Sequence, residues 1–220
     1  MSGAATVDAG VRTLVVRCPD WPLTALGVGP LQPALVLASG RVVATTPAAR
    51  EAGVARGQRL REAQFRCPEV RVLERDDSRE ARRFEVVAAA LEDVTPWLEA
   101  WRPGSCAFGV RGPVRLSGGE VNLVGRTARL VVAALDDLVG SAAGHPGCGI
   151  GVADGRFAAG LAAGAADASV VDGGGAVVVP PGGVPAFLAP LPVAVLGRPA
   201  LVDVLVRLGL DTLGAFAALP

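Results

Sequence analysis

Hydrophobic residues recur at strand spacing in the first part of the chain. Residues 12–18 form a β-branched run that stops at Pro19, which predicts a strand followed by a turn and a short helix near Pro22. Two further apolar runs, 33–38 and 41–46, lie on either side of a Ser-Gly turn pair and predict a β-hairpin. The chain therefore begins as a β-rich segment.

The clearest helical pattern follows three polar residues, Asp76, Asp77 and Ser78, which can cap a first turn. Beyond them, apolar side chains recur at helical spacing until Pro96 ends the pattern. One face of this expected helix carries Phe84, Val87, Ala88, Leu91 and Val94. Such a face predicts that the helix packs against another element.

The rest of the chain continues the alternation of helices and strands. The expected elements are helices within 47–66, a strand at 70–74, two strand segments meeting at Pro103 and Gly104 within 98–110, a helix at 120–138, a strand at 147–153 and an Ala-rich helix at 156–166. Their order predicts an α/β sandwich with helices on one face of a mixed sheet. Residues 172–185 are rich in Gly and Pro and predict a linker, with short helices beyond it.

The composition narrows the possible functions. The sequence has no lysine, so all 21 basic residues are arginines, and 21 acidic residues balance them. Six arginines and only two acids lie within 41–66, a density that can neutralise phosphates; the alternative is a solvated surface. No apolar run approaches the roughly 18 residues of a membrane span and no export signal is present, so we expect a cytoplasmic protein.

Common catalytic motifs are missing from the sequence. A Walker loop needs a lysine, and the single histidine, His145, lies in a turn-like stretch without a nucleophile elbow. We therefore expect His145 to be a loop residue without a catalytic role. The cysteines are spaced too widely for a metal set and are expected to be reduced, partly buried thiols: Cys18, Cys67, Cys106 and Cys148. No cofactor is expected.

Four segments together resemble Y-family (UmuC/DinB-like) DNA polymerases. Residues 42–68, VVATTPAAREAGVARGQRLREAQFRCP, resemble the family's fingers segment, in which S-Y-E-A-R-x-x-G-V-x-x-G-M-P-x-x-x-A precedes a Cys-Pro. The helix ending at Pro96, followed by RPGSCAF, is similar to the helix and strand that carry Ser-Ile-Asp-Glu-Ala. Residues 149–166, GIGVADGRFAAGLAAGAA, resemble the G-I-A-x-N-K-x-L-A-K-x-A-S segment, and residues 201–220 resemble the helix-hairpin-helix of the thumb.

The resemblance implies an α/β (α+β) fold with three parts. A ferredoxin-like palm is expected from residues 1–27 and 76–172, and a small fingers subdomain from residues 28–75. Residues 173–220 are expected to form a linker and a short helical thumb. The sequence is then expected to end before a little-finger domain, as a fragment or a truncated product.

The family's active-site positions are altered in this sequence. The resemblance places Cys18, Gly104 and Ser105 where polymerases of the family carry three metal-binding carboxylates, and it leaves Asp20 as the retained acid. No catalytic residue and no metal site are therefore expected.

The family's nucleotide contacts are altered as well. The tyrosine and second lysine that contact the triphosphate align with Pro47 and Gly160, and the aromatic residue that excludes ribonucleotides aligns with Leu23. Only the family arginine is retained, as Arg50. This residue is expected either as a vestigial phosphate contact or in a salt bridge with a neighbour such as Glu51 or Glu62.

One branch of the family shares these changes. CPDWP at 18–22, the RPG at 102–104 and VVPPGGVPAFLAPLPVAVL at 178–196 are similar to the catalytically inactive ImuB-type proteins. That resemblance implies a role in translesion synthesis during the damage-induced SOS response, as a partner of a RecA-like accessory protein, the sliding clamp and an error-prone replicative-type polymerase.

Three functional hypotheses follow from the sequence. The first is a non-catalytic scaffold whose fingers arginines lie along a DNA backbone: Arg41, Arg56, Arg59, Arg61 and Arg66. The second is an active lesion-bypass DNA polymerase that uses displaced acids such as Asp20 and Glu99. The third is a protein-interaction module without affinity for DNA.

Overall fold

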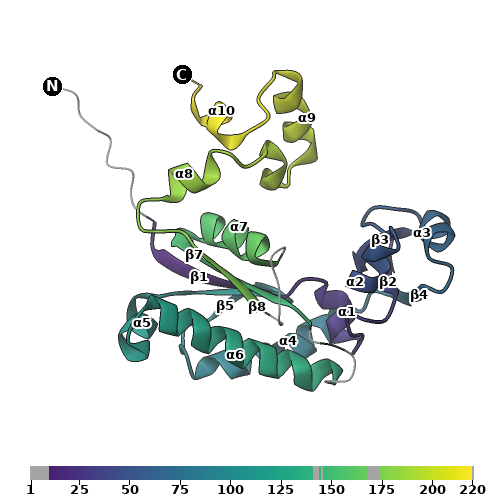
Figure 1. The fold of residues 1–220 in the computed structure, drawn as a ribbon, viewed down its shortest axis with the longest axis horizontal. Helices are drawn as coiled ribbons and strands as arrows, with labels where there is room; N and C mark the ends of the chain where they lie inside the picture. Colours follow the sequence, from purple (N-terminus) through teal and green to yellow (C-terminus); the bar gives the residue numbers. More distant parts are fainter. Residues whose placement is uncertain (1–9, 141–143, 145, 168–173, 220) are drawn as a thin grey trace.

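The structure, a computed structural model, describes residues 10–140, 144, 146–167 and 174–219. A five-stranded sheet occupies the centre of the molecule, and a separate three-stranded sheet lies at one end (Figure 1). Helices cover both faces of the larger sheet, and the small helices of the C-terminal part lie beyond one of these layers. His145, expected in a loop, lies outside the described residues.

The five-stranded sheet has the strand order β5-β6-β1-β7-β8. Its strands are β1 (Arg12–Arg17), β5 (Glu99–Arg102), β6 (Ser105–Gly109), β7 (Cys148–Asp154) and β8 (Gly174–Val178). The central strand, β1, is antiparallel to both neighbours, and Val15 lies opposite Ala107 on β6 and Gly151 on β7. The strands predicted within 12–18, 98–110 and 147–153 are confirmed.

Two helices connect the strands in the manner of a ferredoxin-like fold. After β1, the chain passes through the separate three-stranded unit and then enters α4 (Asp77–Glu92) and the β5–β6 hairpin. After a short helix, α5 (Arg111–Ser117), it continues through α6 (Glu120–Val139) into β7. This repeated strand-helix-strand order confirms the predicted mixed α/β fold with a ferredoxin-like palm.

The main hydrophobic core lies between the five-stranded sheet and helices α4 and α6. Alternate residues of β1, Leu14 and Val16, point into this core, because successive side chains of a strand face opposite sides. Phe84, Val87 and Leu91 of α4 are buried against them, as the predicted apolar face requires. The core also contains Cys106, and burial raises the pKa of its thiol to about 12.

The prediction that helices cover only one face of the sheet is wrong. Helix α7 (Arg156–Asp167) packs on the opposite face, where its alanines surround Val15 and Ala107. This contact is close because Gly151 has no side chain: a Cβ there would lie 2.0 Å from the Ala159 carbonyl oxygen. An Ala-rich helix and a glycine in the strand below it therefore form a second, thinner layer.

The segment expected to be a linker contains a strand. Residues 174–178 form β8, which lies parallel to β7 with Ala176 opposite Ile150. The run of valines that follows the glycines explains the difference, since β-branched residues favour a sheet edge. The linker prediction rested on the Gly- and Pro-rich composition of residues 172–185 and not on these valines. The division of the chain into palm, fingers and thumb stays a prediction.

The three-stranded sheet has the order β3-β2-β4 and its own small core. Its strands are β2 (Ala34–Ala38), β3 (Arg41–Thr45) and β4 (Arg71–Glu74). Between β3 and β4 lie two short helices, α2 (Pro47–Glu51) and α3 (Leu60–Arg66). Leu35, Val42, Val54 and Ala63 are buried together in this core. The hairpin predicted around the Ser-Gly turn is β2 and β3.

The C-terminal part consists of short helices packed around a few apolar residues. They are α8 (Val184–Leu188), a 3₁₀ helix at Val193–Leu196, α9 (Pro199–Arg207) and α10 (Leu213–Ala217). Val193, Leu205 and Leu213 form the buried centre of this group. The short helices predicted beyond the linker are confirmed.

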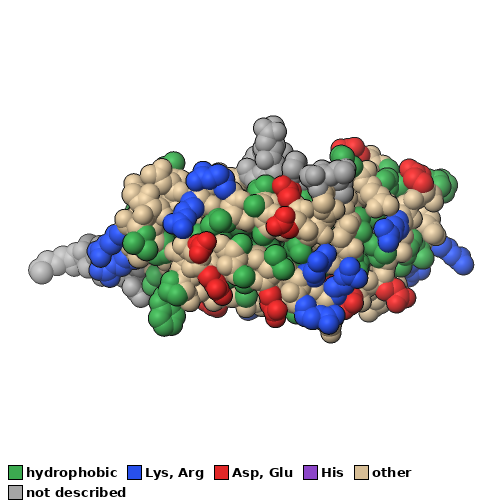
Figure 2. Space-filling view, turned by 90° about the horizontal axis from the view of Figure 1, so that it is seen from below, with side chains coloured by type: hydrophobic (Ala, Val, Ile, Leu, Met, Phe, Trp, Pro, Cys, Tyr) green, Lys and Arg blue, Asp and Glu red, His purple; other side chains and the backbone are tan. Residues whose placement is uncertain are grey.

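The face of the molecule that carries α4, α5 and α6 has a mixed charge. Figure 2 shows acidic and basic side chains interspersed on it, with hydrophobic side chains between them. All four cysteines are buried, and none is joined in a disulfide. Within the described ranges, no helix combines the length and the apolar character needed to cross a membrane.

Candidate functional site

The ends of β1 and β6 meet at a small cavity. The Cys18 amide donates a hydrogen bond of 2.8 Å to the Gly104 carbonyl, and Arg17 lies opposite Ser105 in the strand register. The cavity beside them has a volume of about 180 Å³. Its charged lining residues are Arg17, Asp20, Arg56, Arg75, Glu80 and Arg102. The positions aligned with the family's metal ligands therefore lie side by side at this cavity.

The backbone at Gly104 leaves no room for a side chain. Gly104 has a φ of +84°, in the left-handed region that favours glycine. A Cβ on Gly104 would lie 2.5 Å from the Trp21 Cβ and 2.8 Å from its Cγ. An aspartate at this position would collide with the tryptophan unless the backbone moved.

Trp21 is fixed in the place where it blocks that side chain. The residue is buried at the start of α1 (Trp21–Ala25), and its indole Nε1 donates a hydrogen bond of 3.0 Å to the Glu80 carbonyl. Its ring also meets Phe84 edge to face, with 5.1 Å between the ring centroids. These contacts tie the indole to α4, so it cannot easily move aside.

The two neighbouring positions also lack a carboxylate. Cys18 is buried within the main core, and Ser105 is buried at the start of β6. The Ser105 hydroxyl oxygen accepts a long hydrogen bond of 3.4 Å from the Arg102 Nε. Neither side chain is a hard oxygen anion of the kind that Mg²⁺ prefers.

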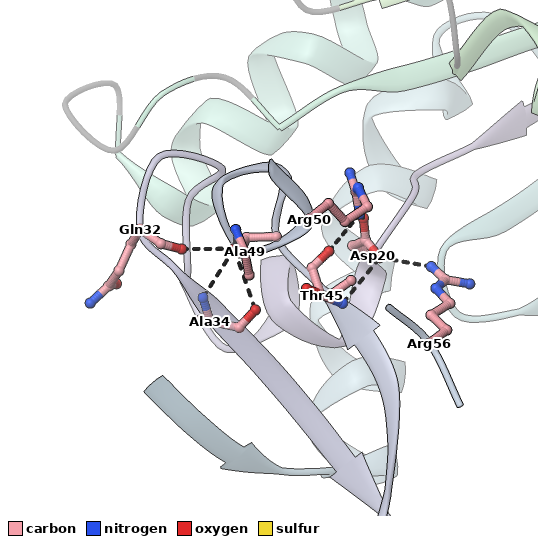
Figure 3. Close-up of polar contacts among 8 residues, drawn as sticks. Asp20, Gln32, Ala34, Thr45, Ala49, Arg50 and Arg56 are labelled. Atoms are coloured by element: carbon pink, nitrogen blue, oxygen red, sulfur yellow. Dashed lines mark hydrogen bonds and ion pairs between the residues drawn. The ribbon is translucent and has the colours of Figure 1, made fainter. Parts of the chain in front are cut away.

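The retained acid, Asp20, is held by two arginines from the three-stranded unit (Figure 3). Arg50 of α2 forms an ion pair with its Oδ2, and the Arg56 Nη2 lies 2.7 Å from its Oδ1. The Thr45 amide adds a hydrogen bond of 3.5 Å to Oδ1. The Asp20 side chain is only 10% exposed, so these partners, and not water, surround most of its carboxylate.

Local backbone contacts place Arg50 beside Asp20. Thr46 caps the N-terminus of α2, and its hydroxyl oxygen accepts a hydrogen bond of 3.3 Å from the Ala49 amide. The same oxygen accepts a hydrogen bond of 3.0 Å from the Ala34 amide of β2. These bonds fix the first turn of α2 against the sheet. The expected salt bridge of Arg50 therefore exists, but with Asp20 in place of Glu51 or Glu62.

Glu80 is the second acid at the cavity, and Arg75 binds it with both arms of its guanidinium. Arg75 Nε lies 3.0 Å from Glu80 Oε1, and Nη2 lies 3.2 Å from Oε2. These hydrogen bonds raise the pKa of Arg75, more than burial lowers it. The Glu80 side chain is only 4% exposed, whereas that of Arg75 is 43% exposed, so Arg75 pairs with a buried carboxylate from the surface side.

The residues at this cavity do not fit the pair of divalent cations that the resemblance implies. Such cations need several converging carboxylates, whereas Gly104 has no side chain and Asp20 is bound by two arginines. In the part of the chain that the structure describes, no three His, Cys, Asp or Glu side chains gather closely enough to hold a metal ion. The arginines would also repel a cation.

Glu99, the other acid considered as a displaced ligand, lies apart from Asp20. It forms an ion pair with Arg156 at the start of α7 and is largely exposed. Glu99 lines a different cavity from Cys18 and Gly104, beside Val11 and Gly155. The two acids are therefore not brought together.

The fingers arginines predicted to contact DNA are all exposed. Arg41 and Arg59 lie beside each other through an isolated β-bridge, while Arg61 and Arg66 lie on α3. Arg56 differs from the other four because it points toward Asp20. Of the five predicted arginines, Arg56 therefore points toward Asp20, and the other four face solvent.

Sequence reasoning missed the residues that shape the cavity. Trp21, Arg75 and Glu80 were not identified: the contact of Trp21 with α4 joins residues 59 positions apart, and the nearby Arg75–Glu80 pair belongs to no motif that the sequence offered. The one available signal for Trp21 was its place in CPDWP at 18–22, next to the residues aligned with the family's first metal ligand. Pro47 and Leu23 line a neighbouring cavity with Arg50, and Gly160 lies on α7.

Comparison with known proteins agrees with the family resemblance. The model of the impB/mucB/samB family matches residues 25–164, which is more than half of the chain. DNA polymerase IV of Dehalococcoides mccartyi is 30% identical over 184 residues, covering 82% of this chain and 43% of that protein. The chain therefore spans less than half the length of this relative.

Solved structures share the fold. A ternary complex of Dbh has a TM-score of 0.70 and 19% identity, covering 94% of this chain and 60% of that chain. DinB from Sulfolobus solfataricus has a TM-score of 0.67 and 17% identity, covering 95% and 60%. A Dbh-Dpo4 chimera described as a Y-family DNA polymerase has a TM-score of 0.68 and 17% identity, covering 91% and 58%. This chain belongs to the impB/mucB/samB family and has the palm and fingers fold of Y-family DNA polymerases.

Proposed function

We propose that this chain is a non-catalytic Y-family homologue that holds DNA during translesion synthesis. The observation that carries the proposal is the packing of Trp21 against Gly104. An essential carboxylate would have to project from Gly104, and its first carbon would lie 2.5 Å from the Trp21 Cβ. In this proposal, the Trp21 side chain occupies the space that a metal-binding carboxylate at position 104 would need.

The charges at the cavity support the same conclusion. Four arginines and two carboxylates line it, and each carboxylate is already paired with an arginine. Two unit charges 4 Å apart interact by about 4 kcal/mol at an effective dielectric constant of 20, so the arginines oppose the entry of Mg²⁺. Nucleotidyl transfer by two metal ions has no support in this arrangement.

The exposed fingers arginines are the proposed DNA contacts. Arg41, Arg59, Arg61 and Arg66 face solvent. Arginine binds phosphate through paired N–H donors, and such contacts give affinity without sequence preference. Two of the structural relatives are described as ternary complexes of Dbh, a DNA polymerase. We extend DNA contact, but not catalysis, from those proteins to this chain.

The resemblance to ImuB-type proteins adds the proposed partners. They are a RecA-like accessory protein, the sliding clamp and an error-prone replicative-type polymerase. In this proposal the chain supplies a polymerase-shaped surface for DNA, while a partner polymerase supplies the chemistry.

A salt titration of DNA binding tests the scaffold role. Fluorescence anisotropy with a labelled primer-template duplex measures the slope of log affinity against log salt concentration. Each arginine that contacts a phosphate steepens the slope by about one, so Arg59→Ala with Arg61→Ala lowers its magnitude by about two.

Arg115→Ala is the matched control, because Arg115 is an exposed arginine on α5, outside the three-stranded unit. It should leave the slope unchanged. Absence of any salt-dependent DNA binding would contradict the proposal and favour a protein-interaction module.

A further inference from the structure

Two buried cysteines lie on neighbouring strands at one end of the five-stranded sheet. The antiparallel register of β1 with β7 pairs Arg17 with Gly149. One step further along this register, Cys18 lies opposite Cys148, the first residue of β7. The two residues are therefore neighbours across the sheet, although they are far apart in the sequence.

Both side chains point into the main hydrophobic core. Alternate residues of β1 and then Cys18 belong to this core, as do alternate residues of β7 from Cys148 onward. Opposed side chains on the same face of an antiparallel pair are direct neighbours. Cys18 is 4% exposed and Cys148 is 0% exposed, so both thiols are enclosed by protein on this face of the sheet.

The hydrogen bonds around Cys18 show which kind of cross-strand pair it forms. The Cys18 amide donates to the Gly104 carbonyl, so its backbone hydrogen-bonding groups face β6 and turn away from β7. Cys18 and Cys148 therefore form a pair without hydrogen bonds between their own backbones. Val152, an even number of positions from Cys148, agrees with this pattern, because its carbonyl turns away from β1 and accepts a hydrogen bond from the Val179 amide.

A pair of this kind has the dimensions of a disulfide bond. The Cα atoms of directly opposed residues without mutual hydrogen bonds lie about 4.5 Å apart. Disulfide bonds join residues whose Cα atoms are about 4.4–6.8 Å apart. The other two cysteines lack such a partner, because Cys106 lies opposite Val16 and Cys67 is buried in the core of the three-stranded sheet. The register thus selects Cys18 and Cys148 from the four cysteines.

The position of the pair gives small molecules a route to it. Cys18 lines the cavity of about 180 Å³ at the ends of β1 and β6. Gly147, immediately before Cys148, lines a neighbouring cavity together with Pro19. The ends of strands also open at a lower free energy than their centres, so the thiols can be exposed while the rest of the core stays folded.

We propose that Cys18 and Cys148 form an oxidation site, at which a low-molecular-weight disulfide converts the two thiols into an intramolecular disulfide bond. The Cys18 thiolate attacks one sulfur of the small disulfide, which releases one small thiol and leaves a mixed disulfide on Cys18. The Cys148 thiolate then attacks the Cys18 sulfur and releases the second small thiol. The two cysteines together lose two electrons and two protons, and the small disulfide is reduced to two thiols. An excess of small thiol reverses both steps.

The bond ties the end of β1 to the start of β7. The loop that it closes contains the whole three-stranded unit and helices α4 and α6. Closing a long loop removes conformational freedom mainly from the unfolded chain, so the oxidised form is the more stable one. This inference goes beyond the proposed scaffold role and does not depend on DNA binding.

Mass spectrometry of the whole chain, oxidised in its folded state, tests the assignment. The protein is incubated with oxidised glutathione without denaturant, then unfolded in an alkylating reagent and cleaved with trypsin. Peptides 18–41 and 130–156 are expected to be joined, with two fewer alkylated thiols per chain. Cys67→Ala is the matched control and should give the same joined peptides, whereas Cys18→Ala should give none.

Thermal unfolding supplies a second measurement that needs no variant. The oxidised chain is expected to unfold about 5–15 °C above the chain kept in dithiothreitol, and addition of dithiothreitol to the oxidised chain should reverse the gain. A chain that keeps all its thiols under oxidation, or joined peptides that contain Cys67 or Cys106, would overturn the proposal. So would glutathione attached to Cys18 without any bond to Cys148.

Discussion

Strands β1 and β6 carry different kinds of residues in their middle and at the end where they meet the cavity. In the middle, Leu14, Val16 and Phe108 are buried in register against α4 and α6. At the end, Cys18 and Gly104 stand where the family resemblance places metal ligands. The same strands thus contribute to a hydrophobic core in one part and carry no carboxylate at these two positions in the other.

This contrast indicates that the stability of the fold rests on the hydrophobic core and not on the residues at the cavity. Buried apolar area supplies most of the free energy of folding, and the core between the sheet and its helices is complete. Clustered carboxylates repel one another when no metal is bound, so their removal costs the fold little. On this argument, replacing metal ligands at the end of the strands is compatible with a stable core in their middle.

The largest expected effect comes from the core. Leu91→Ala removes a fully buried side chain and should lower the free energy of unfolding by about 2–5 kcal/mol. Leu116→Ala, at a leucine that is 83% exposed, should change it by less than about 0.5 kcal/mol. Urea unfolding of both variants measures the difference. Equal losses would show that α4 does not anchor the sheet.

The second effect tests the packing of Trp21 against Gly104. Gly104→Ala should lower the free energy of unfolding by about 2–4 kcal/mol, because strain at positive φ adds to a collision. Gly40→Ala is the matched control, since Gly40 has a φ of +72° and nothing within 4 Å of an added Cβ. It should cost only about 1–2 kcal/mol. Equal costs in the two variants would remove the steric argument against an acid at position 104.

A smaller effect is expected at the ion pairs of Asp20. Asp20→Asn weakens the contacts with Arg50 and Arg56, which join the two sheets, and should cost about 1–2 kcal/mol. Faster proteolysis within residues 41–66 would accompany the loss. Asp77→Asn alters an exposed partner of Arg75 and should cost less than about 0.5 kcal/mol. Identical proteolysis of Asp20→Asn and the original chain would contradict this role.

The smallest effect concerns pH and the buried thiol of Cys106. Burial raises its pKa from the ordinary 9.0 to about 12 in the folded chain. Its contribution to stability is therefore complete below pH 9 and is lost as the pH rises toward 12, at up to about 1.4 kcal/mol per pH unit. Urea unfolding at pH 8 and 10 should show a steeper loss in the original chain than in Cys106→Ala. Parallel losses would contradict the assignment.

The sequence predicted those parts of the fold that rest on local patterns. The apolar face of α4 follows from residues three and four apart, and the β2–β3 hairpin follows from its Ser-Gly turn. The second helical layer was missed because it depends on Gly151 lying beneath Ala159 and Ala163, a contact that no local pattern records.

The candidate site was predictable only where the family resemblance assigned residues. Cys18 and Gly104 could be named in this way, and the strand register places them side by side. The block by Trp21 and the pairing of Asp20 with Arg50 depend on three-dimensional packing between α1, α2 and α4. Such contacts join residues 30 or more positions apart and leave no periodic signal.

Primer extension by the purified chain tests the central claim most directly. A labelled primer-template duplex, all four deoxynucleotides and either Mg²⁺ or Mn²⁺ are supplied over a range of protein concentrations. The account predicts no metal-dependent lengthening of the primer at any concentration. Extension that requires the metal and disappears in Asp20→Ala would show that this acid binds a catalytic cation, and the claim of a non-catalytic homologue would be wrong.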